Sequence, residues 1–172
     1  AGTGGNAGNI TLNDAVVLTG NRVLSAVGGT GGTAGSGGNL QPLGTVDGNV
    51  AATRTLTLTA GTGDVTVAGT VGASFSLSAL TITGNDLSLA SLGGASAGIS
   101  GATLVTAATA GLDTGSLAFT GTTYNANAQT YTAPSGQTLL VNAGASTTFS
   151  STADAITFTT GTLSLADGSH LV

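Results

Sequence analysis

Residues 54–72 read RTLTLTAGTGDVTVAGTVG, and this stretch decides the fold. Leucine, and then valine, occupies every second position with threonine between, and the turn-forming run 60–64 separates the two parts. An apolar residue at every second position is typical of a short strand with one buried face. The stretch therefore predicts two strands, joined by a glycine-containing corner, whose outward faces carry threonine.

The same alternation recurs along the chain, in triplets separated by Gly, Asn and Asp residues that favour turns. The clearest triplets are 10–12, 56–58, 65–67, 75–77, 80–82, 87–89, 156–158 and 163–165. Towards the C-terminus, strand starts at 139, 147, 156 and 163 are only seven to nine residues apart, too close for the longer strands of a sandwich or barrel. We therefore predict an all-β fold, a parallel β-helix (β-solenoid) formed by one segment, 1–172, with about 20 to 25 residues per coil and about seven or eight coils.

Two glycine-rich stretches interrupt this rhythm. Residues 1–8 read AGTGGNAG and residues 28–38 read GGTGGTAGSGG. Such composition is typical of flexible connections, so we expect 28–38 to form a flexible connection or a lateral loop.

The composition excludes several functions. Charged residues make up 5% of the chain, against about a quarter in an average globular protein. Arg22 and Arg54 are the only basic residues apart from one histidine, and the net charge is −5, so the chain lacks the cations needed to bind nucleic acid. The sequence contains no run of about 18 apolar residues, so it does not predict a membrane-spanning helix. The chain has no cysteine, so it has neither a disulfide nor a thiolate metal site.

Two motifs of catalytic or cofactor chemistry occur, and each lacks its structural context. Residues 94–98 fit G-x-S-x-G, but a nucleophile elbow requires a long strand before it and a helix after it. Residues 29–34 fit G-x-G-x-x-A without the helix that receives a pyrophosphate. We predict no enzyme, no catalytic residue and no cofactor.

Aspartates and tyrosines are the remaining candidates for sites. Asp64, Asp86 and Asp167 are weak candidates for calcium ligands, because carboxylates with backbone carbonyls suit that ion, but each also stands where a turn former is expected. We expect turn residues and no metal site. Tyr124 and Tyr131 could form a small adhesive or inter-subunit patch, although packing within the fold is the preferred interpretation.

Threonine-x-threonine units occur at 55–57, 57–59, 81–83 and 157–159. A flat array of such units can bind ice, which requires the units on one face of consecutive coils. In the sequence they are scattered and interleaved with other triplets, so ice binding, like carbohydrate binding, is an alternative function and not the main prediction. A pilus-like β-sandwich subunit with donor-strand exchange is a further alternative.

Residues 8–21 (GNITLNDAVVLTGN), 56–72 (LTLTAGTGDVTVAGTVG) and 77–91 (LSALTITGNDLSLAS) resemble the repeats of filamentous-haemagglutinin-like giant adhesins. The resemblance implies a right-handed parallel β-helical shaft, export, and a role in adhesion, cell contact or extracellular fibres. The Asn-Pro motif of that family's secretion domain is absent: the two prolines follow Gln41 and Ala133.

The two ends of the chain suggest assembly. His170, Leu171 and Val172 read as a final strand, and Ile10 and Leu12 belong to the first clear triplet. An unpaired solenoid end offers backbone donors and acceptors that another chain can extend. We therefore expect these five residues to take part in head-to-tail self-association, or the segment to belong to a longer chain. The other expected partners are lateral copies and a host or neighbouring cell surface, with an extracellular or cell-surface location.

Overall fold

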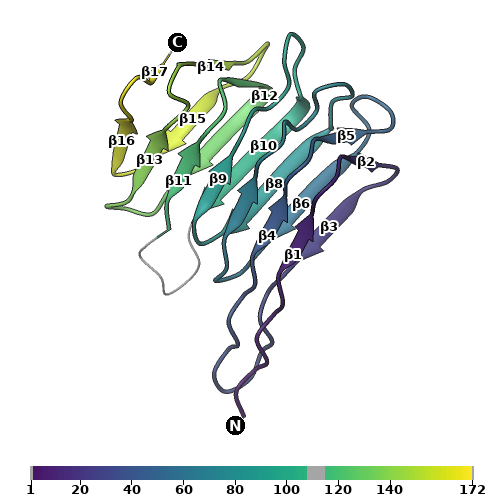
Figure 1. The fold of residues 1–172 in the computed structure, drawn as a ribbon, viewed down its shortest axis with the longest axis vertical. Coiled ribbons are helices and arrows are strands. Elements are labelled where there is room, and N and C mark those ends of the chain that lie inside the picture. The colour runs from purple at the N-terminus through teal and green to yellow at the C-terminus, as the bar shows by residue number, and fades with distance from the viewer. Residues whose placement is uncertain (1, 108–114, 172) are drawn as a thin grey trace.

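The computed structural model describes residues 2–107 and 115–171, and these form a parallel β-solenoid of about 5 turns (Figure 1). Every strand pair in the described residues is parallel, and those residues contain no helix. The prediction of an all-β parallel solenoid is confirmed. A sandwich of antiparallel strands is not the fold, which removes the basis for the donor-strand alternative.

Three sheets run along the solenoid. The first has the order β1 (Ile10–Leu12), β4 (Leu40–Pro42), β7 (Val65–Val67), β9 (Leu87–Leu89), β11 (Leu117–Phe119), β13 (Thr138–Val141) and β16 (Thr162–Leu165). The second contains β3 (Arg22–Ser25), β6 (Thr55–Thr59), β8 (Ala79–Gly84), β10 (Ile99–Ala107), β12 (Thr123–Thr132) and β15 (Ile156–Thr159). The shortest begins with β2 (Val16–Leu18) and β5 (Val46–Gly48) and continues through single bridges at Val71, Leu92 and Tyr124. The first half of β12 then pairs with β14 (Ser146–Ser150), and β14 pairs with β17 (His170–Leu171).

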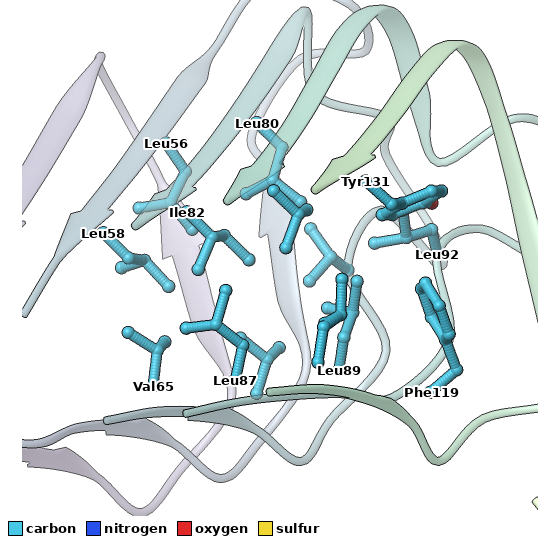
Figure 2. Packing of buried hydrophobic residues seen from close by; sticks show 14 of the residues in the cluster. Leu56, Leu58, Val65, Leu80, Ile82, Leu87, Leu89, Leu92, Phe119 and Tyr131 are labelled. Carbon is cyan, nitrogen blue, oxygen red and sulfur yellow. The ribbon is translucent and has the colours of Figure 1, made fainter. Parts of the chain in front are cut away.

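Like residues stack on like residues inside the solenoid. One ladder of the first sheet, in register from coil to coil, is Ile10, Leu40, Val65, Leu87, Leu117, Leu139 and Leu163. Its counterpart in the second sheet is Leu24, Leu58, Ile82, Val105, Tyr131 and Phe158. Figure 2 shows side chains from the two sheets meeting between them, Val65 and Leu87 opposite Leu58 and Ile82. Leu163, at the last position of its ladder, is 41% exposed, and Ile10, Leu24 and Phe158 are partly buried. Burial of the other apolar side chains, about 1.5 to 3 kcal/mol for each large one, stabilises the coils.

The coils differ in length, and this corrects the predicted number of coils. Equivalent corner residues are separated by 30, 25, 22 and 30 residues from Asn9 to Asn39, Asp64, Asp86 and Ser116. Two of these four coils thus carry more residues than the predicted 20 to 25, and the described residues complete about 5 turns, fewer than the predicted seven or eight coils.

The triplet 75–77 is not a strand. The amides of Ser74 and Phe75 both donate hydrogen bonds to Oδ1 of Asp47, at 2.8 and 3.2 Å, which turns the chain at this point. Phe75 is 49% exposed, whereas Leu77 is buried and makes a single bridge to Ile99. The alternation of three residues was therefore too short to identify a strand here.

The glycine-rich stretches pack against each other in a narrow extension that projects from one end of the sheets (Figure 1). The amides of Gly4 and Ala7 donate to the carbonyls of Thr33 and Ser36, at 2.8 and 2.9 Å. Hydrogen bonds that recur at every third residue have the period of the polyproline II helix, and not the two-residue period of a strand.

Glycine is required where these segments approach each other. A Cβ atom on Gly35 would lie 2.1 Å from the carbonyl oxygen of Gly5, and one on Gly28 would lie 2.0 Å from that of Gly35. The stretch 28–38 is thus a lateral loop paired by backbone hydrogen bonds with residues 2–8.

Thr103 occupies an inward position between Leu80 and Gln129, and its hydroxyl has no hydrogen-bond partner. We expect Thr103→Val to raise the free energy of unfolding by about 1 kcal/mol, because valine has the same shape and removes an unpaired buried hydroxyl. Urea denaturation measures this change, with Thr66→Val at an outward position of β7 as the control. Lower stability of Thr103→Val would contradict the expectation.

Candidate functional site: the threonine face

No pocket is found in the described residues, and no three His, Cys, Asp or Glu side chains among them gather so that they could hold a metal ion. The most regular surface is the outward side of the second sheet.

The threonine face consists of the outward residues of β6, β8, β10, β12 and β15. Two columns run across these strands in register. They are Thr57, Thr81, Leu104, Thr130 and Thr157 in one column and Thr59, Thr83, Thr106, Thr132 and Thr159 in the other. All positions but one are threonine, and the exception, Leu104, is 44% exposed.

The structure therefore overturns the interpretation that the threonine-x-threonine units are scattered. The units 57–59, 81–83 and 157–159 lie on one sheet, and Thr130 and Thr132 add a further unit. The unequal coil lengths hid this alignment, because residues that are neighbours across strands are separated by different numbers of residues along the chain.

The hydroxyl groups of these threonines face away from the core. Among the described residues none of them hydrogen-bonds to another protein group, whereas Thr120 and Thr160, at corners, donate to backbone carbonyls. Each hydroxyl on the face is thus available to water.

The surroundings of the two columns are small and uncharged. Two residues before the first column, the outward positions of β8, β10 and β12 are occupied by Ala79, Ala102 and Ala128. No charged residue belongs to the outward positions of β6, β8, β10, β12 or β15. The nearest charges along the chain, Arg54, Asp86 and Asp154, lie before β6, after β8 and before β15.

The first sheet has no comparable outward surface. Its outward column contains Thr11, Gln41, Thr66, Ser88, Ala118, Leu140 and Ser164. Side chains of different size and polarity follow one another there, so the regular array is a property of the second sheet and not of solenoid corners or strands in general.

Two of the calcium candidates form part of a ladder at one corner of the solenoid. Oδ1 of Asn39 accepts the amide of Asp64 at 3.0 Å, Oδ1 of Asp64 accepts the amide of Asp86 at 3.1 Å, and Oδ1 of Asp86 accepts the amide of Ser116 at 2.9 Å. Asp167 lies at the turn after β16, far along the chain from this ladder. The structure thus brings Asp64 and Asp86 together as backbone acceptors and does not bring Asp167 to them by any hydrogen bond in the described residues.

Tyr124 and Tyr131 lie in the core and are fully buried, so the surface patch is wrong and the packing interpretation is confirmed. Their rings join Phe119, Phe149 and Phe158 in an aromatic cluster, and Figure 2 shows Tyr131 and Phe119 inside the solenoid. Both fall on inward ladder positions, which the strand period alone could have identified. The hydroxyl of Tyr124 donates to the carbonyl of Leu89 at 2.6 Å.

Burial raises the pKa of both tyrosines well above the usual value of 10.0. In the unfolded chain they ionise near pH 10, so above that pH the folded state binds more protons and its stability falls as the pH rises. We expect the free energy of unfolding to decline as the pH rises above about 10. The two tyrosines are the only ones in the chain, so ultraviolet absorbance of tyrosinate reports on them alone.

The absorbance of tyrosinate should appear together with the loss of the circular dichroism of the strands. Tyrosinate that forms reversibly near pH 10 while the circular dichroism is unchanged would contradict this prediction.

The residues expected to act in assembly lie at opposite ends of the strand order. Ile10 and Leu12 lie in β1, the edge strand of the first sheet, and are half-buried. His170 lies in β17 at the far edge, paired with Ser146, and Leu171 pairs with Thr147. Val172 lies outside the described residues. Ile10, Leu12, His170 and Leu171 thus lie in strands at the ends of the strand order, and the role of all five residues in assembly stays a prediction.

Residues 94–98, the G-x-S-x-G match, form a turn between Leu92 and β10, where the amide of Gly94 donates to the carbonyl of Ser96. Residues 29–34 lie in the glycine-rich extension. The described residues also contain no helix long and apolar enough to cross a lipid bilayer.

The fold and the surface together define the class: the chain is a parallel β-solenoid repeat protein with a regular threonine face. No family model, curated protein or solved structure matches this chain.

Proposed function

We propose that this chain is a structural segment of an extracellular or cell-surface fibre, a stiff shaft used in adhesion, cell contact or extracellular matrix. The observation that carries the proposal is the pair of continuous core ladders through about 5 turns, in which the interior strands, such as β8, β9 and β11, pair with a strand of the coil before and of the coil after. Such a stack resists bending, since each coil is fixed by its neighbours.

The resemblance to filamentous-haemagglutinin-like giant adhesins supports the same proposal. It rests on the repeats at 8–21, 56–72 and 77–91, and it adds export and contact with a host or neighbouring cell surface. Head-to-tail continuation at β1 and β17 and lateral bundling are the partners that this proposal implies. It involves no reaction and no cofactor.

A binding module for carbohydrate has less support. Such modules commonly offer aromatic side chains as a platform, but five of the six aromatic residues belong to the core cluster, and Phe75 alone is largely exposed. A single ring does not form a platform.

Stretching the chain along the solenoid axis tests the proposal. Force spectroscopy between handles at the two termini should show high resistance and stepwise release of coils, because each coil is held by two neighbours. Release of the whole chain in one step at low force would contradict a load-bearing role. Electron cryomicroscopy of the native protein provides a second test, in which a thin rod with a repeat of about 4.8 Å is expected and discrete globular particles would contradict the fibre.

A further inference from the structure

We propose that the threonine face is a binding site for the surface of ice. This inference rests on the outward side of the second sheet and is independent of the shaft, which rests on the core.

The first argument is the spacing of the array. Neighbouring strands of a sheet lie about 4.8 Å apart, and alternate residues of a strand lie about 6.6 Å apart. The pairing keeps Thr57 and Thr59 in register with Thr81 and Thr83, and Thr130 and Thr132 with Thr157 and Thr159. The hydroxyls therefore form a nearly rectangular net. Oxygen atoms on the faces of hexagonal ice form nets with repeats of similar size in two perpendicular directions.

The second argument is the chemistry of each position. Threonine presents a methyl group beside a hydroxyl, and its branched Cβ restricts the side chain to few rotamers. The hydroxyls have no partner within the protein, as described above. Each is thus free to hydrogen-bond a water molecule, while the methyl groups limit the places that other water molecules can take.

The third argument is the stiffness of the net. The strands below it are fixed by ladder hydrogen bonds and by the buried residues Leu58, Ile82, Val105 and Tyr131 directly between the outward columns. An array that is ordered before binding loses little conformational entropy on binding. Figure 1 shows β6, β8, β10 and β12 side by side in one sheet, as a flat ligand surface requires.

The same features disfavour other ligands. The face lacks the cations that nucleic acid requires and the aromatic rings that favour sugar chains, and it is not hollowed for a small molecule. The surface of an ice crystal is flat, uncharged and periodic. It therefore requires no pocket, no cations and no aromatic rings on the protein, and it matches a flat, uncharged and regular face.

Thermal hysteresis of purified protein and its uptake into a growing ice hemisphere test the proposal. The face variants are Thr81→Lys and Thr130→Lys, each of which places a long charged side chain within the array. The matched control is Thr66→Lys, at an outward position of the first sheet. Circular dichroism and thermal denaturation verify that all three variants fold.

We expect hysteresis and uptake for the unmodified chain and for Thr66→Lys, and the level of an unrelated globular protein for the two face variants. We also expect Leu104→Thr, which completes the array, to increase the hysteresis.

Absence of both hysteresis and uptake in the unmodified chain, or an equal loss in the Thr66→Lys control, would overturn the proposal. A concentration-dependent dimer in sedimentation that only the face variants abolish, or retention on crystalline cellulose or chitin without ice uptake, would likewise overturn it and assign the face to a second copy or to a polysaccharide. None of these outcomes depends on the force measurement that tests the shaft.

Discussion

Replacing Phe119 by alanine is expected to lower the free energy of unfolding by about 3 to 5 kcal/mol. The side chain is fully buried, and its ring lies 5.0 Å from that of Tyr124, 4.9 Å from that of Tyr131 and 5.0 Å from that of Phe149, measured between ring centroids. These contacts are edge-to-face, the arrangement that the charge distribution of aromatic rings favours. Alanine would leave a cavity at the centre of the cluster, which the surrounding ladders cannot close.

Urea denaturation followed by circular dichroism measures the loss, and Phe75→Ala is the matched control. Phe75 is 49% exposed and lies outside the cluster, so its replacement should cost much less. Equal losses for the two variants would show that the cluster does not stabilise the solenoid in the way that we derive from its packing.

Gln129→Leu is the second substitution for which we expect a large effect, a loss of about 3 kcal/mol or more. Gln129 is fully buried in an inward position, and each of its polar atoms is engaged. Nε2 donates to the carbonyls of Ala126 and Ser150, at 2.9 and 2.7 Å, and Oε1 accepts the hydroxyl of Tyr131 at 2.8 Å. Leucine has a similar size but would remove all three hydrogen bonds, two of them to the buried residues Ala126 and Tyr131 and one to the half-buried Ser150, and each buried polar group left unpaired costs about 1 to 3 kcal/mol.

The control for this substitution is Gln41→Leu on the outward side of β4. Gln41 makes one long hydrogen bond at its side chain, 3.4 Å from the hydroxyl of Thr11, so we expect a change near zero. Double substitution of Gln129→Leu with Tyr131→Phe removes one of the orphaned groups and should recover part of the loss. Failure to recover any stability would contradict the assignment of the cost to unpaired groups.

The strands and their two-residue period could be predicted from the sequence, because apolar residues on one face and small polar residues on the other are a local signal. The triplets at 56–58, 80–82 and 163–165 all lie within strands. The strand β4 could not be predicted in this way, since Pro42 lacks an amide donor and proline is rare within sheets.

The threonine face could not be predicted from local pattern, because it depends on which residues meet across the strands. That register depends on corners of unequal length, among them the glycine-rich loop 28–38. Gln129 was missed for a related reason: a glutamine within a strand reads as outward and polar, and its position inside the core is decided by the carbonyls that it bonds.

The ladder of Asn9, Asn39, Asp64 and Asp86 gives the solenoid a chemical direction. In every rung the acceptor oxygen belongs to the earlier coil and the donor amide to the later one. When the chain emerges during synthesis or export with its N-terminus first, the side chain that accepts each of these hydrogen bonds appears before the amide that donates it. If the coils fold in the order in which they emerge, each corner amide finds its acceptor already in place. If they folded from the C-terminal end, the newest corner amide would be unpaired at each step.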